Sequence, residues 1–316
     1  MGEIGCVIFA AFVLDFLVGD PRWLPHPVVG MGNAITFFEP RFRAWVSNPL
    51  SAGLIFAVFL IVSTWALAFG VVKLTTWIHP VLGTWVQVLL LFYCFSATSL
   101  VQAAVAVARP LESRDIETAR KKVAMIVGRE TQNLDTAAIT RATVETVAEN
   151  FVDGFLSPLF FALLFGVPGA VAYKMVNTLD SMVGYQNETY LLFGRASARI
   201  DDVANFIPAR LSVLVIFLAA FLLSAKRGLS ALKTGISQGR RHKSPNAGYP
   251  EASFAGALRI RMGGPSVYHG KVVVKPYIGG QFNDPDLSGI TRACELMMLS
   301  ALISTLAAWG VSWLFV

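Results

Sequence analysis

Long apolar stretches alternate with polar segments along this chain. No charged residue lies between Arg43 and Lys73, and residues 50–72 consist almost wholly of apolar side chains. A helix of about 20 apolar residues is long enough to cross a bilayer. The same criterion predicts three further spans, at residues 83–107, 207–225 and 296–316. Between the first two spans, His79-Pro80 predicts the turn of a helical hairpin.

Two weaker apolar stretches complete the pattern. Residues 4–18 are interrupted by Asp15, and residues 154–173 by Pro158 and by Gly166-Val167-Pro168-Gly169. Each is expected either to span or to be re-entrant. No basic residue precedes the first stretch, so we interpret it as retained and not as a cleaved signal peptide. The pattern predicts an all-α polytopic membrane protein, a single integral membrane domain (1–316) with about four to six transmembrane or re-entrant helices.

Composition agrees with a membrane protein. The chain is 55% hydrophobic and 15% charged, against about 25% charged residues in ordinary soluble proteins. Three scattered cysteines do not make a disulfide framework or a zinc motif. The net charge of +6 is explained by anionic lipid headgroups, and without an aromatic-interleaved basic stripe we expect no nucleic-acid partner.

Polar segments 19–49, 109–153, 174–209 and 226–295 are expected to form a water-facing functional face. Segment 226–295 carries 11 Lys and Arg against four acidic residues, and segment 109–153 carries seven Lys and Arg. The positive-inside rule places both on the cytoplasmic side of the cell (inner) membrane. If 154–173 and 207–225 both span, segment 174–209 lies on the opposite side. If 154–173 is re-entrant, segment 174–209 returns to the inside, and the topology stays open.

The densest polar cluster lies at residues 140–153. Arg141, Glu145, Glu149 and Asp153 recur every four residues, so a helix would place them on one ridge. One interpretation is a solvated face with an Arg141–Glu145 pair. The other is a functional site, because acidic groups at membrane depth are costly and carboxylates beside Asn150 suit Mg²⁺.

A second cluster follows at residues 174–188. Lys174, Asn177, Asp180 and Ser181 share one helical face, and Gly184 can end or bend that helix. Lys174 directly follows the broken apolar stretch. It is expected either to anchor the helix at the interface or to bind a phosphate group.

A third cluster lies at residues 195–210. Arg195 and Arg199 are one turn apart, as are Asp201 and Asn205, with Asp202 between them. Planar guanidinium donors suit phosphate oxygens, and carboxylate and amide oxygens suit Mg²⁺. Three such clusters beside apolar sequence point to a phosphorylated substrate.

Three loops complete the candidate chemistry. In residues 15–27, three prolines exclude a regular helix, and Arg22 and His26 are candidate functional side chains. Residues 244–251, with Asn246, and 261–268 are predicted as turn-rich loops. Gly263-Gly264 either approaches a ligand closely or only turns the chain. The sequence has no P-loop, dinucleotide-binding, zinc-protease or nucleophile-elbow motif.

Three runs of sequence resemble the adenosylcobinamide-phosphate synthase family of cobalamin biosynthesis. They are LDFLVGDPRWLPHPVVGMGNAI (14–35), the long run from IVGRETQNLD to NFIPARL (126–211), and SPNAGYPEASFAGALRIRMGGPSVYHG (244–270). The resemblance implies an integral membrane enzyme. The implied reaction is ATP-dependent amide formation between adenosylcobyric acid and (R)-1-aminopropan-2-ol or its O-phosphate. Other late cobalamin-pathway enzymes are possible partners of such a protein.

This reaction requires Mg²⁺ and cations around ATP, a base for the incoming ammonium and donors for an oxyanion. We therefore assign roles to the polar clusters as a hypothesis. Glu149 or His26 is the expected base, with Glu145 beside it. Mg²⁺ is expected at Asp153, Asp180, Asp201 and Asp202. Substrate and phosphate groups are expected at Lys174, Arg195, Arg199, Asn177, Asn205, Arg22 and Asn246.

Two alternatives stay open at this point. A Mg²⁺-dependent prenyltransferase or phosphotransferase also carries Asp-rich motifs on membrane helices, although Asn177-x-x-Asp180 and Asn150-x-x-Asp153 lack the remaining repeats of those motifs. A corrinoid transporter or scaffold would need no catalytic residues, and inverted repeats would favour the transporter.

Overall fold

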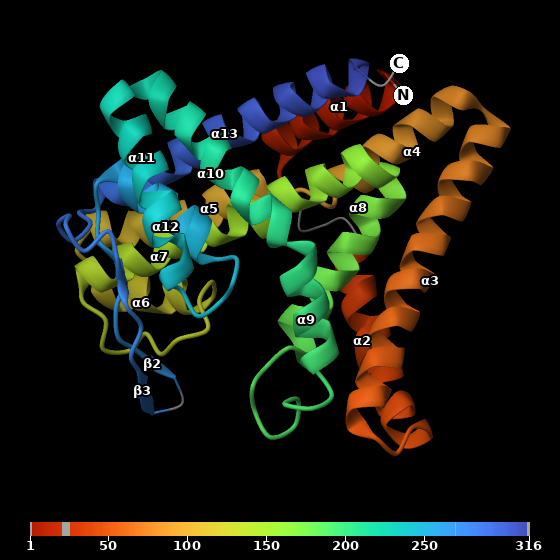
Figure 1. The fold of residues 1–316 in the computed structure, drawn as a ribbon, viewed down its shortest axis with the longest axis horizontal. Helices are drawn as coiled ribbons and strands as arrows, with labels where there is room; N and C mark the ends of the chain where they lie inside the picture. The colour runs from red at the N-terminus through yellow and green to blue at the C-terminus, as the bar shows by residue number, and fades with distance from the viewer. Residues whose placement is uncertain (1, 21–25, 269, 315–316) are drawn as a thin grey trace. The chain divides into compact units, whose positions relative to one another are not determined.

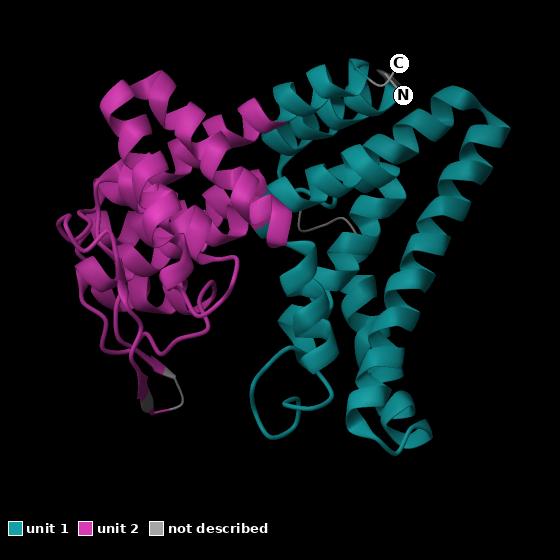
Figure 2. Ribbon diagram, viewed as in Figure 1, with its two compact units in different colours: residues 1–96, 153–205, 305–316 teal, residues 97–152, 206–304 magenta. Residues whose placement is uncertain are grey.

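The structure is a computed structural model that describes residues 2–20, 26–268 and 270–314. The described chain is mainly helical (Figure 1). By close packing it forms two compact units, each assembled from separate stretches (Figure 2): Met1–Ser96, Asp153–Asn205 and Thr305–Val316 make unit 1, and Ala97–Val152 with Phe206–Ser304 make unit 2.

Unit 1 is a set of packed apolar helices. Its helices are α1 (Gly2–Val18), α2 (Pro27–Trp45), α3 (Pro49–Ile78), α4 (Pro80–Phe92), α8 (Ser157–Val183), α9 (Arg195–Ala204) and the end of α13 (Ser288–Trp313). α2 packs along α3 through rings, with Phe38 and Phe59 centroids 5.2 Å apart and Phe42 and Phe56 centroids 5.7 Å apart. Such edge-to-face aromatic pairs add to the favourable free energy of burying the rings.

The predicted hairpin at His79-Pro80 is confirmed. α3 ends at Ile78, α4 begins at Pro80, and the Nδ1 atom of His79 accepts a hydrogen bond from the Val81 amide at 3.2 Å. Pro80 occupies the first helical position, where its missing N–H costs nothing. His79 is therefore a capping residue of the turn.

Unit 2 is built around a helix with no solvent-facing side. Its helices are α5 (Ala97–Glu112), α6 (Ile116–Ala124), α7 (Thr136–Phe151), α10 (Phe206–Leu223), α11 (Ala225–Gln238), η2 (Gly239–Arg241), α12 (Gly248–Leu258) and the first part of α13. Every residue of α12 is buried, as expected for a helix at the centre of a packed unit. Two antiparallel strand pairs follow it: β1 (Met262–Gly263) with β4 (Tyr277–Ile278), and β2 (Ser266–Tyr268) with β3 (Lys271–Val273).

Five helical stretches of the described chain are long and apolar enough to cross a membrane, which confirms an all-α polytopic membrane protein. They are Pro49–Ile78, Pro80–Glu112, Thr136–Val183, Phe206–Leu223 and Ser288–Trp313. The weaker 154–173 stretch falls inside the third. The other weak stretch, 4–18, forms α1, whose 17 residues are fewer than the roughly 20 that a perpendicular span needs.

The Thr136–Val183 stretch is not one uniform helix. Residues Val152–Leu156 form a π-helical turn, η1, between α7 and α8. Gly166 then breaks α8 with φ +70° and ψ −179°, two residues before Pro168. Only glycine adopts that conformation without strain, so the interruption predicted at 166–169 is confirmed as a kink.

Some loop predictions are wrong in part. Asp15 belongs to α1 and is fully buried, so the irregular segment begins only after Val18; residues 21–25 lie outside the described chain. Residues 248–251 form the first turn of α12, and 262–263 and 266–268 form strands β1 and β2. The sequence did not predict these two strands, because glycine and proline are abundant there and each strand is too short to show an alternating pattern.

The closest helix packing in unit 2 gives a stability prediction. A Cβ atom at Gly256 of α12 would overlap the carbonyl oxygen of Ser230 on α11 and lie 2.8 Å from the Thr234 Oγ1 atom. We expect Gly256→Ala to lower the free energy of unfolding by about 1–3 kcal/mol, the usual cost of overpacking. Thermal unfolding in detergent would measure this.

Gly70→Ala is the matched control. Gly70 also lies inside a helix, but no atom would come within 4 Å of its Cβ. Here alanine should leave stability unchanged or raise it by about 1 kcal/mol through helix propensity. Equal losses in the two variants would contradict the packing argument.

Candidate active site

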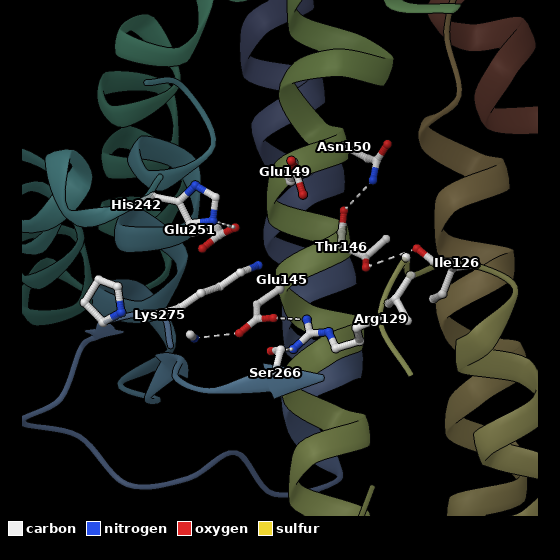
Figure 3. A pocket seen from close by; sticks show the side chains of 14 residues that line it. Ile126, Arg129, Glu145, Thr146, Glu149, Asn150, His242, Glu251, Ser266 and Lys275 are labelled. Atoms are coloured by element: carbon white, nitrogen blue, oxygen red, sulfur yellow. Dashed lines mark hydrogen bonds and ion pairs between the residues drawn. The ribbon is translucent and has the colours of Figure 1, made fainter. Parts of the chain in front are cut away.

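A polar cavity of about 240 Å³ lies in unit 2 (Figure 3). Charged side chains from four segments line it. They are Arg129 before α7, Glu145 and Glu149 on α7, His242 before α12, Glu251 in the first turn of α12, and Lys275 before β4. Three carboxylates and two permanent cations thus share one small space.

α7 provides one wall of this cavity. The Asp135 carboxylate caps the helix by accepting the Ala138 amide at 2.7 Å. Glu145 and Glu149 are one turn apart, so both point to the same side of α7, as Figure 3 shows. Glu145 is buried, whereas Glu149 is exposed to solvent.

Both oxygens of Glu145 have protein partners. Its Oε2 atom accepts a hydrogen bond from Arg129 Nη2, and its Oε1 atom accepts the Gly263 amide at 2.6 Å. Arg129 also donates to Ser266 Oγ at 3.2 Å. The ion pair is largely buried, because only 13% of the Arg129 side chain and 10% of the Glu145 side chain are exposed. The hydrogen bond from the Gly263 amide to Glu145 joins β1 to α7.

The backbone conformation at residue 263 requires glycine at this contact. Its φ is +74°, and a Cβ atom there would lie 2.5 Å from the Pro276 carbonyl oxygen. Any other residue would be strained and crowded. The Gly263 amide thus bonds to Glu145 of the same chain, and the approach of Gly263-Gly264 to a ligand stays a prediction.

Glu251 and His242 face each other across the cavity. Glu251 is 4% exposed, and His242 Nε2 lies 3.9 Å from its Oε1 atom. Burial, reinforced by the negative charges of Glu145 and Glu149, raises the pKa of the Glu251 carboxyl well above its ordinary value. Burial, reinforced by Lys275, lowers the pKa of the His242 imidazole.

The tautomer of His242 follows from its neighbour. Its Nδ1 atom accepts the Ser244 amide at 3.0 Å, so a neutral imidazole carries its proton on Nε2 and directs it toward Glu251. His242 is thus a donor in this cavity. Glu251 is the group whose raised pKa suits it to accept a proton from a weak acid near neutral pH.

The cavity suits Mg²⁺ only if most of the ligands of the ion come from water and substrate phosphates. Within the described residues, no group of three or more His, Cys, Asp or Glu side chains is placed to hold a metal. Mg²⁺ commonly uses one or two carboxylates together with water and substrate phosphates. The Glu149 carboxylate is exposed and has the hard oxygens for that role.

A second group of predicted residues lies in unit 1, between α8 and α9. Asn205 is buried, accepts hydrogen bonds from Ser157 Oγ at 2.6 Å and Tyr173 Oη at 2.8 Å, and donates to Asp201 at 3.0 Å. Asn205 therefore links the two helices. Asp153 also lies near Tyr173.

The remaining members of that group are more open. Asp180 on α8 and Asp202 on α9 are near enough to interact electrostatically. Burial raises the pKa of Asp202, while Arg199, 3.8 Å away, opposes that rise. Lys174 and Asn177 lie on α8 and Arg195 starts α9. Their metal and phosphate roles remain predictions.

Other predicted residues have structural partners. His26 caps α2, with Nδ1 accepting the Val28 amide at 3.2 Å and Nε2 3.4 Å from Asp20. Asn246 is buried and accepts a hydrogen bond from Arg210 at 3.3 Å. Arg22 lies outside the described residues.

Two details of the predicted α7 ridge are wrong. Arg141 pairs with Asp284, which follows β4, and Glu145 pairs with Arg129, which precedes α7, so the two residues do not pair with each other. Asp153 lies on the π-helical turn η1, where the extra residue per turn shifts it from the α-helical register. The ridge is thus Glu145 and Glu149 alone at the cavity.

Four ionisable residues of the cavity were not predicted: Arg129, His242, Glu251 and Lys275. Arg129 and Glu251 fall inside the runs 126–211 and 244–270 that carry the family resemblance, and that was the one signal available for them. Lys275 stands in a short basic and β-branched segment with no motif. These four side chains come together only when distant segments of the chain fold against one another.

Comparisons with known proteins match this chain to one protein family. A family model described as "CobD/Cbib protein" matches residues 8–297. The chain is 46% identical over 305 residues to "Cobalamin biosynthesis protein CobD" of Klebsiella pneumoniae, covering 95% of each chain. It is 45% identical over 314 residues to the CobD protein of Geobacter metallireducens, covering 97% of this chain and 98% of the relative. It is 46% identical over 297 residues to "Cobalamin biosynthesis protein CbiB" of Salmonella typhimurium, covering 93% of each. No solved structure matches the chain.

Proposed function

Because the chain belongs to the CobD/CbiB family of cobalamin biosynthesis proteins, we propose that it is a membrane ligase. Its reaction joins adenosylcobyric acid to (R)-1-aminopropan-2-ol or its O-phosphate with ATP. The observation that carries this proposal is the buried Glu251 carboxyl, with its raised pKa, in a cavity that also holds Arg129, Lys275 and the exposed Glu149.

The chemistry explains why such a cavity is needed. A carboxylate resists attack by an amine because it is negatively charged and has no good leaving group. In the proposed reaction a carboxylate oxygen attacks the γ-phosphorus of ATP, and ADP leaves. The amine nitrogen then attacks the acyl carbon, phosphate leaves, and a base takes the proton that the ammonium must lose.

We assign the base to Glu251. Burial raises the pKa of the Glu251 carboxyl toward the pKa of an ammonium group, which favours transfer of a proton from the ammonium to Glu251. The Nε2–H of His242 faces Glu251 and orients it. His26 is a weaker candidate, because its Nδ1 lone pair is used to cap α2.

The cations and Glu149 are assigned to the phosphates. Lys275 points into the cavity (Figure 3) and would bind phosphate oxygens as a point charge. When bound with ATP, Mg²⁺ would supply charge neutralisation for phosphoryl transfer. Glu149, the carboxylate open to solvent, would be its protein ligand.

The cavity size limits what it can enclose. Its volume of about 240 Å³ is below the roughly 300–1,000 Å³ of pockets that bury drug-sized ligands. The corrin ring is larger than such ligands. We therefore assign the cavity to the reacting carboxyl, the aminopropanol and the transferred phosphate, with the corrin remaining outside it.

The direct test is product formation by the purified full chain in detergent. Given ATP, Mg²⁺, adenosylcobyric acid and aminopropanol phosphate, we expect one ADP for each corrinoid that gains the mass of the amine less one water, measured by mass spectrometry. Omission of the amine should abolish the mass gain. Tight corrinoid binding without any mass gain would refute the ligase and favour the transporter or scaffold.

A further inference from the structure

A second groove in unit 2 lies between α10 and α11 and has a volume of about 550 Å³. Its walls are apolar: Val213 and Leu214 come from α10, and Leu232 and Ile236 come from α11. Leu214 is 53% exposed and Ile236 is 65% exposed. α10 is one of the five possible membrane spans, so this apolar wall belongs to a helix suited to hydrocarbon.

One end of the groove carries two arginines. Arg210 lies in the first turns of α10, and Arg240 follows the end of α11. Because α10 and α11 are joined at Ser224 and pack against each other, the start of α10 and the end of α11 lie at the same end of the helical hairpin. Both guanidinium groups line the groove there.

The described partners of Arg210 are all neutral. Its Nη1 atom donates to the Phe206 carbonyl at 2.6 Å and to Asn246 Oδ1 at 3.3 Å. Its guanidinium lies 4.5 Å from the centre of the Tyr249 ring. Among the residues that the structure describes, no carboxylate forms an ion pair with Arg210 or Arg240.

The surrounding sequence reinforces this positive charge. From residue 203 to residue 250 there are seven Lys and Arg residues and no Asp or Glu. A positively charged end on an apolar groove beside a membrane span matches a ligand with an anionic head and an apolar tail. Arginine binds phosphate oxygens in a planar, bidentate way.

We propose that this groove binds an anionic phospholipid. The lipid phosphate contacts Arg210 and Arg240, and an acyl chain lies along Val213, Leu214, Leu232 and Ile236. Buried Asn246 and the Tyr249 ring hold the Arg210 side chain in place. This site is separate from the Glu251 cavity and does not depend on the proposed reaction.

Native mass spectrometry and thermal unfolding of the full chain in detergent test this inference. Three probes are compared: phosphatidylglycerol, phosphatidylcholine with the same acyl chains, and glycerol phosphate without chains. We expect phosphatidylglycerol to bind and to raise the melting temperature, with at least about tenfold weaker binding of the other two. Equal binding of phosphatidylcholine would refute recognition of anionic charge. Equal binding of glycerol phosphate would refute a lipid site.

Arg210→Gln/Arg240→Gln is the informative variant, and Lys226→Gln/Arg227→Gln is its matched control. The control removes the same charge from the opposite end of α11. We expect the first variant to weaken phosphatidylglycerol binding by at least about tenfold and the control to leave it nearly unchanged. Should the first variant not fold, Arg240→Gln alone, at an exposed residue, should still reduce binding. Equal losses in the variant and the control would overturn the assignment.

Discussion

Glu251→Gln is expected to lower turnover by about 10²- to 10⁴-fold, the usual contribution of a general base. Glutamine keeps the size and shape of the side chain at this buried position but cannot accept the ammonium proton. Binding of the corrinoid should be nearly unchanged, because we place the ring outside the cavity. Turnover measured with saturating ATP and amine, next to corrinoid affinity, separates these effects.

The pH dependence of stability checks that the variant acts through ionisation. In the folded protein the pKa of Glu251 is raised by burial and by Glu145 and Glu149. Its stabilising contribution is therefore complete below the ordinary glutamate pKa and is lost as pH rises through the folded-state value. Glu251→Gln does not ionise, so relative to the wild type it should gain stability as pH rises from the ordinary glutamate pKa through the raised pKa of folded Glu251.

A surface substitution provides the control for these measurements. Glu117 is 72% exposed and pairs with Arg120, and such ion pairs contribute little to stability. Glu117→Gln should leave both turnover and the pH profile of unfolding unchanged. Wild-type turnover in Glu251→Gln would remove Glu251 from the reaction and return Glu149 as the candidate base.

Arg129→Ala is expected to be the most destabilising change at the site, by about 3–5 kcal/mol. The substitution leaves Glu145 as a buried carboxylate whose opposite charge is gone, while its other oxygen still holds the Gly263 amide. Unfolding free energies in detergent would measure the loss. Activity should fall as well, because β1 and Lys275 are positioned through this contact.

The double variant Arg129→Met/Glu145→Gln distinguishes an unpaired charge from lost packing. It removes both charges and keeps most of the side-chain volume. We expect it to be clearly more stable than Arg129→Ala, since neutral replacements of a buried pair are often tolerated. If the double variant were as unstable as the sum of the two single changes, the two residues would act independently.

The apolar helices could be predicted from the sequence because they depend on local patterns. The absence of charge over 44–72, the His79-Pro80 turn and the interruption at Gly166 each leave a signal within a few residues. The helical face of Glu145 and Glu149 was predicted for the same reason. The predicted four to six spans also include the five observed candidates.

The cavity could not be predicted in full because its contacts join distant segments. Glu145 bonds to Arg129, 16 positions away, and to Gly263, 118 positions away. Nothing in the spacing of α7 shows that these partners replace the expected Arg141. The π-helical turn at Val152–Leu156 likewise changes the direction of Asp153, and Gly154 and the nearby Pro158 do not distinguish such a turn from an ordinary kink.

The interleaving of the two units has a consequence for biosynthesis. Unit 1 begins with the first helix but also includes residues from Thr305 onward, and unit 2 needs segments on both sides of Asp153–Asn205. Domains made of one continuous stretch can fold one after another as the ribosome extends the chain. Here the first helices must wait in the membrane until the last helix has been translated, so folding of both units is largely post-translational. The helices of unit 1 that precede Ser96 are therefore expected to lack part of their packing until the residues from Thr305 onward have been made.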